Sequence, residues 1–129
     1  NRSAALDSPV RALPSIDYLQ HLQRAFVLKR KLDRRGEIDE LLLCLTAVKQ
    51  AAVPDSATAC RVLRYVGEAF ISLSDFKSAS DYYFDWYLIA SKSGDRKQMK
   101  TALTSLGHLC HVSGDLSNAE KWLSQADAV

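Results

Sequence analysis

The residues best suited to chemistry are two histidines and a cysteine near the end of the chain, His108, Cys110 and His111. His108 and His111 are three residues apart, so on a helix both would point to one side and could bind a metal ion. Zinc normally takes four protein ligands with recognisable spacing, and the sequence offers no second ligand pair. We therefore interpret the two histidines as helix-surface residues and expect no metal and no other cofactor.

Catalytic motifs are also missing from the sequence. It contains no Gly-rich phosphate loop, no HExxH motif and no set of nucleophile, base and acid. Its carboxylates are scattered at positions typical of turns and helix caps. These absences predict that the protein is not an enzyme and works by binding.

Composition and charge narrow the class of protein further. The 129 residues suffice for one domain, and 47% hydrophobic with 25% charged residues is typical of a globular protein. A formal charge of +2 argues against a nucleic-acid or membrane protein. Three cysteines without CxxC spacing indicate reduced thiols, so we expect a cytoplasmic protein, with the nucleus as the alternative. Because the chain begins with Asn1 instead of Met, we expect a piece of a longer protein.

The elements that must position these residues are helices, because only 5 Gly and 3 Pro interrupt the chain. Residues 1–14 lack periodicity and predict a flexible leader, or alternatively a strap that packs through Val10 and Leu13. Apolar residues at helical spacing then predict six helices. Their approximate ranges are 15–35, with a Gly36 cap, 37–53, 56–73, 75–92, 95–112 and 115 to the end.

One pattern occurs twice in the second half of the chain, with every position shifted by 40 residues. The first copy comprises Leu63, Val66, Gly67, Phe70, Ser74-Asp75-Phe76, Ala79 and Tyr83. The second copy comprises Leu103, Leu106, Gly107, Cys110, Gly114-Asp115-Leu116, Ala119 and Leu123. A repeat of this length is typical of a stacked array of helix pairs.

These residues resemble the tetratricopeptide repeat (TPR), and the long spacing is similar to the extended repeats of cell-polarity scaffolds and kinesin light chains. The resemblance implies an all-α fold with three antiparallel helix pairs, stacked as a right-handed solenoid over residues 15–129. The copies would cover about 16–53, 56–93 and 95–129. In the first copy Gly36-Glu37-Ile38 would be the turn, which puts Lys29 where the family has glycine.

The resemblance also implies that the first helix of each pair lines a concave groove. Transferring the family's positions places three groups of residues there: Gln23, Phe26, Arg30 and Arg34; Arg61, Arg64, Glu68 and Ile71; and Thr101, Thr104, His108 and His111. Four arginines against one glutamate predict a basic groove for an acidic or amphipathic segment of another protein. The alternative is a solvated face with ion pairs such as Arg64 with Glu68. Chaperone tails are disfavoured, since the family's asparagines are absent.

Two further surfaces follow from the pattern. Phe84 and Leu88 are predicted to face outward as an exposed apolar pair. Trp122 and Ala126 correspond to Tyr82 and Trp86, which are expected to face the next pair, and with Val129 they predict an uncapped assembly surface. Further repeats, a second copy in a homo-oligomer or a partner helix would cover it. A structural assembly segment is therefore the alternative to a protein-binding groove. Nucleic-acid binding along the arginine face is the weakest hypothesis.

Overall fold

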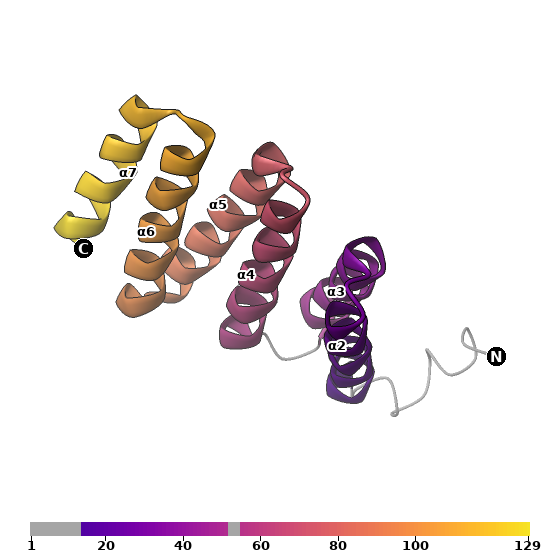
Figure 1. Ribbon diagram of the computed structural model, residues 1–129. Helices are drawn as coiled ribbons and strands as arrows, with labels where there is room; N and C mark the ends of the chain where they lie inside the picture. The colour runs from indigo at the N-terminus through magenta and orange to yellow at the C-terminus, as the bar shows by residue number, and fades with distance from the viewer. Residues whose placement is uncertain (1–13, 52–54) are drawn as a thin grey trace.

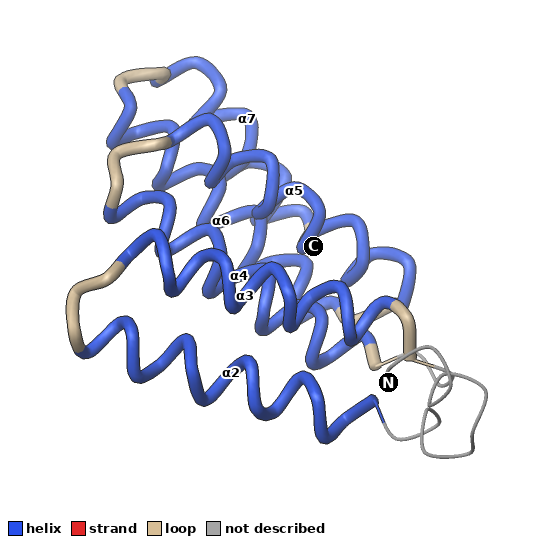
Figure 2. Tube along the Cα trace, turned by 90° about the vertical axis from the view of Figure 1, so that its right-hand side faces the viewer, coloured by secondary structure: helices blue, strands red, loops and turns tan. Residues whose placement is uncertain are grey.

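A computed structural model describes residues 14–51 and 55–129, and these ranges form six α-helices without a β-strand. The helices are α2 (Pro14–Arg30), α3 (Arg34–Lys49), α4 (Ser56–Ser72), α5 (Phe76–Ser93), α6 (Arg96–Ser113) and α7 (Leu116–Ala128) (Figure 1). Each helix packs on the next one along the chain, and Figure 2 shows them side by side. This arrangement confirms the predicted all-α array of three helix pairs. The predicted leader lies outside the described residues except for Pro14, the first residue of α2.

Five helices begin in the same way, after an aspartate whose carboxylate accepts a backbone N–H from three residues further on. A cap of this kind stabilises a helix by about 1 kcal/mol because it satisfies an otherwise unpaired amide. The five caps are Asp33, Asp55, Asp75, Asp95 and Asp115.

The turn of the first pair differs from the prediction. Helix α2 ends at Arg30, Leu32 takes a left-handed conformation at φ 61°, and Asp33 caps α3. Gly36 therefore does not end a helix but lies in the first turn of α3. A Cβ atom on Gly36 would lie 2.6 Å from Asp33 Oδ2, so the cap itself explains the glycine.

This correction shifts the first repeat by four residues, about one helical turn. Leu32 now matches Ser74, which has the same left-handed conformation at φ 59°. Ala25, only 1% exposed, then takes the place of Gly67 and Gly107, whereas Lys29 is exposed. The predicted alignment with Lys29 at the glycine position is wrong, and every first helix has a small residue where it crosses its partner.

The glycines mark close approaches between the helices of a pair. A Cβ on Gly67 would lie 2.3 Å from Tyr83 Cε1, and one on Gly107 would lie 2.6 Å from Leu123 Cδ2. Both distances are far below van der Waals contact, so any side chain there would force the partner helix outward. Glycine is therefore a packing requirement at these two crossings.

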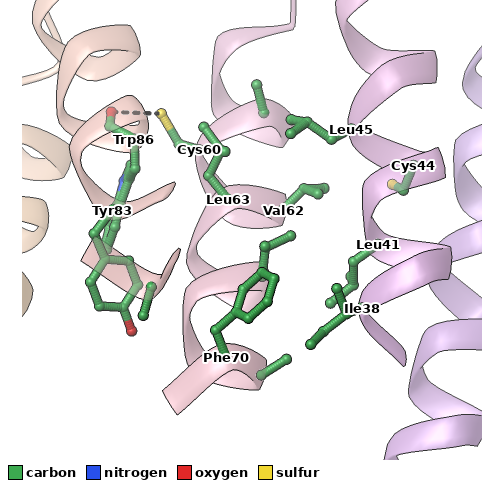
Figure 3. Packing of buried hydrophobic residues seen from close by; sticks show 14 of the residues in the cluster. Ile38, Leu41, Cys44, Leu45, Cys60, Val62, Leu63, Phe70, Tyr83 and Trp86 are labelled. Atoms are coloured by element: carbon green, nitrogen blue, oxygen red, sulfur yellow. Dashed lines mark hydrogen bonds between the residues drawn. The ribbon is translucent and has the colours of Figure 1, made fainter. Parts of the chain in front are cut away.

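The core is continuous from the first pair to the third. Figure 3 shows the part of it that α3, α4 and α5 form. Leu63 and Val62 of α4 lie between Leu41 of α3 and Trp86 of α5, and all four are at most 1% exposed. Burial raises the pKa of the Cys44 and Cys60 thiols to about 11, so both are neutral core residues. In the described part of the chain, no helix is both long and apolar enough to cross a membrane.

Candidate functional site

The first helices α2, α4 and α6 share a surface that we call the first-helix face. On α4 it consists of Arg61 and Glu68, which are exposed, and Arg64 and Ile71, which are partly buried. On α6 it consists of Thr101, His108 and His111, which are exposed, and Thr104, which is partly buried. The residues predicted on these two helices are therefore all at least partly exposed.

Arg64 is loosely held on this face. Its Nε lies 3.8 Å from Glu68 Oε2, too far for a hydrogen bond, and the guanidinium carbon lies 5.6 Å from the centre of the Tyr65 ring. The Nε atom is buried and has no hydrogen-bond partner. Because both side chains of the pair are more than 40% exposed, at 42% and 48%, the ion pair contributes little to stability. The guanidinium therefore keeps donors for another acceptor.

A hollow opens beside these arginines, between α4 and the start of α6. Gln98, which the sequence analysis missed, closes it from α6. Its Oε1 accepts a hydrogen bond of 2.8 Å from Nε1 of the buried Trp86. Gln98 is the third residue of α6, so the sequence indicated only a helix start there. The hollow is lined by Ala57, Thr58, Cys60, Arg61, Arg64 and Gln98.

Helix α2 contributes an aromatic residue to the face. The Phe26 ring meets the Tyr65 ring edge-on, with centroids 5.6 Å apart, and thereby joins the first helices of two pairs. Phe26 remains 38% exposed, and Arg30 follows it one turn later on the same side. With the corrected register, Leu19 and Lys29 are the equivalents of Arg61 and Ile71, and Leu19 is 47% exposed. The α2 part of the face thus combines exposed apolar side chains with the basic residues Lys29 and Arg30.

Two predicted groove residues lie elsewhere. Arg34 belongs to α3, not to a first helix, and its Nη1 lies 3.2 Å from Oε1 of the buried Glu37. Its assignment to the groove is therefore wrong. The cause is the four-residue shift of the first repeat, which also places Gly36 inside α3. Gln23 lines a separate hollow between α2 and α3, where Val27 and Glu40 are among its neighbours.

The predicted assembly surface is also corrected. Ala126 is only 2% exposed, so it is unavailable to a partner. The Trp122 ring lies against Phe84 of α5, with centroids 6.0 Å apart, and so faces the preceding pair instead of a following one. Val129 is partly buried, and its carbonyl accepts a hydrogen bond from Arg96.

The surface that α7 leaves open mixes polar and apolar side chains. A hollow between α6 and α7 is lined by His111, Leu116, Glu120, Leu123, Ser124 and Asp127. The equivalent residues of the second pair include Phe76, Tyr83, Phe84 and Tyr87. Ser124 and Asp127 replace Phe84 and Tyr87, whereas Leu116 and Leu123 replace Phe76 and Tyr83, so this face keeps part of its apolar character.

Two other expectations can be compared with the structure. Phe84 and Leu88 are 39% and 47% exposed, as predicted for an outward apolar pair. His108 and His111 are exposed, and the described residues contain no group of three or more side chains that could hold a metal ion.

Comparison with known proteins identifies the architecture. No family model and no curated protein matches the sequence. The structure is similar to the crystal structure of the TPR domain of Arabidopsis FLU, with a TM-score of 0.76. The match covers 89% of this chain and 95% of that chain at 15% sequence identity. The fold is TPR-like. This confirms the predicted right-handed solenoid of helix pairs, and at this identity the likeness concerns the fold alone.

Proposed function

We propose that this protein is a non-catalytic protein-interaction module that binds an acidic or amphipathic segment of a partner on its first-helix face. The observation that carries the proposal is the pair Arg61 and Arg64, which line one hollow in the middle of this face. Among the described residues, Arg61 makes no ion pair or side-chain hydrogen bond, and Arg64 has only its long contact with Glu68. Two guanidinium groups without strong partners are suited to carboxylates.

The neighbourhood of the arginines supports a peptide instead of a small ligand. Exposed Phe26 lies on α2 and partly buried Ile71 lies one turn beyond Glu68, so apolar contacts flank the charged hollow. An amphipathic segment would place apolar side chains on these residues and its acidic side chain in the hollow. The extended-repeat resemblance and the unpaired thiols fit a cytoplasmic or nuclear scaffold.

The test is selection of binding peptides from a random displayed library on the immobilised protein, followed by charge reversal. We expect acidic peptides to be enriched, and the double variant Arg61→Glu/Arg64→Glu to bind them at least about tenfold more weakly. Arg35→Glu/Lys121→Glu is the matched control, because both residues are exposed on second helices and the net charge changes equally. Circular dichroism establishes that both variants fold.

Three results would count against the proposal. Enrichment of neutral or basic peptides would refute the proposal that the first-helix face selects acidic segments. Equal weakening in both double variants would reduce the effect to overall charge. Binding of unrelated oligonucleotides with a steep salt dependence would favour a nucleic-acid partner instead.

Self-association is the alternative that the structure supports less, because Ala126 is buried and Trp122 packs against the preceding pair. Sedimentation velocity at increasing protein concentration tests it directly. Trp122→Ala should leave peptide binding unchanged, because Trp122 contacts Phe84 on the second-helix side. A concentration-dependent dimer would favour assembly.

A further inference from the structure

We propose that the hollow between α4 and α6 holds one carboxylate of the bound segment, and that Gln98 is a specificity-determining residue that recognises it. This inference rests on the proposed function and names the group that the site selects. It assigns a role to Gln98 and, through it, to Trp86 as a positioning residue.

The hydrogen bond between Trp86 and Gln98 decides which end of the amide faces the hollow. An indole nitrogen only donates, so the atom of Gln98 that lies 2.8 Å from Trp86 Nε1 is the carbonyl oxygen. The NH₂ group of the same amide is left as a donor to the hollow. Trp86 is only 1% exposed, so packing holds the indole and thereby the amide in this orientation.

The hollow is therefore lined with donors from two helices. Arg61 and Arg64 of α4 supply guanidinium groups, and Gln98 of α6 supplies a fixed amide. Thr58 adds no donor to the hollow, because its hydroxyl already donates to Asp55 Oδ2 at 2.6 Å. A planar anion with two oxygens can accept from a guanidinium fork and from the amide at the same time.

Charge around the hollow favours a single negative charge over a doubly charged phosphate. Asp55 bonds both the Thr58 hydroxyl and the Thr58 amide, and these bonds, with a smaller contribution from Arg61, lower the pKa of its carboxyl group. Asp55 is thus ionised at neutral pH, and Glu68 adds a second carboxylate on the same helix face. The two guanidinium charges are partly offset, which suits a carboxylate better than a phosphate dianion.

The test is a nuclear magnetic resonance titration that follows the Gln98 side-chain NH₂ and the Nε–H signals of Arg61 and Arg64. Small probes replace the unidentified partner. N-acetylglutamate methylamide represents an internal acidic side chain, and N-acetylglycine represents a chain terminus. N-acetylglutamine methylamide is the neutral control, and N-acetylphosphoserine methylamide is the dianion. We expect saturable shifts of all three residues with a carboxylate probe and none with the neutral control.

Gln98→Glu sharpens the test, because a glutamate oxygen still accepts from Trp86 while the amide donor becomes a negative charge. We expect this variant to bind the carboxylate probe at least about tenfold more weakly. Gln23→Glu is the matched control, since it is the same substitution on an exposed residue of a different hollow. It should bind as the parent protein does.

Failure of this inference is distinguishable from failure of the proposed function. If selected acidic peptides bind but Gln98→Glu behaves like Gln23→Glu, the face binds acidic segments without this subsite. If the carboxylate probe shifts the Gln98 side-chain NH₂ signal but no peptide binds, the carboxylate subsite is supported and the peptide-binding function is refuted. Stronger binding of the phosphoserine probe than of either carboxylate probe would overturn the charge argument.

Discussion

Gly67→Ala is the most informative substitution for testing how the helix pairs pack. The added Cβ would lie 2.3 Å from Cε1 of Tyr83 and 2.6 Å from its Cδ1. Tyr83 is only 4% exposed and its ring lies edge-on to Trp86, with centroids 5.6 Å apart. The ring has no open space to move into, so the two helices must separate.

The expected size follows from two opposing effects. Alanine stabilises a helix interior by about 1 kcal/mol relative to glycine, whereas overpacking a core costs about 1–3 kcal/mol. We therefore expect Gly67→Ala to lower the free energy of unfolding by up to about 2 kcal/mol, measured by urea denaturation. Gly107→Ala should cost less, because the Leu123 side chain that it meets is flexible and only partly buried.

The first helix pair suggests the compensating change. At the positions of Gly67 and Tyr83 it has Ala25 and Leu41, both 1% exposed. In a Tyr83→Leu background, Gly67→Ala should therefore cost less than in the parent protein, since a flexible leucine replaces the tyrosine ring and the helix propensity gain remains. A double-mutant cycle measures the coupling. Additive effects, within about 0.5 kcal/mol, would refute the packing argument.

Two more predictions concern the thiols and the caps. Ellman's reagent at about pH 8 should label partly exposed Cys110 rapidly and Cys44 and Cys60 only after urea unfolding, and Cys110→Ser should remove the fast phase. Because burial raises the pKa of Cys44 and Cys60 from 9.0 to about 11, their contribution to stability is present below pH 9.0 and falls as pH rises towards 11. A denaturation midpoint that is flat over this window would contradict the burial. Asp75→Ala should lower the unfolding free energy by about 1 kcal/mol, since Asp75 accepts from Ser78 N–H and Oγ, whereas exposed Asp39→Ala should change it by less than about 0.5 kcal/mol.

The sequence predicted the second and third helix pairs almost to the residue, because local signals and the repeat agree there. Gly94 and Gly114 end helices in left-handed conformations, and Asp75, Asp95 and Asp115 begin the next ones. The same aspartate signal was present at Asp33, two residues outside the even 20-residue spacing of the later caps. The sequence does not single out this signal, because Arg34-Arg35-Gly36 resembles a helix end and Leu32 gives no sign of its left-handed backbone.

The candidate site was less predictable, because the hydrogen bond between Trp86 and Gln98 joins the second helix pair to the third. Arg61 and Arg64 follow from helical spacing, but the bond that orients Gln98 at the hollow comes from Trp86, and no local pattern in the sequence indicates it. The burial of Ala126 could not be predicted either. Its match to Trp86 gave its position in the repeat, while its burial depends on packing within the last pair.

Repetition itself explains why the hollow should occur between the second and third pairs. The position of Trp86 is occupied by Cys44 in the first pair and by Ala126 in the third, and neither side chain can donate as an indole does. The positions of Arg61 and Arg64 are occupied in the third pair by Thr101 and Thr104, which carry no charge. Since the helix pairs share one backbone pattern, a distinct site can arise only where side chains depart from it. Arg61, Arg64, Trp86 and Gln98 depart from it together, around one hollow, which is the physical reason to look for the partner there.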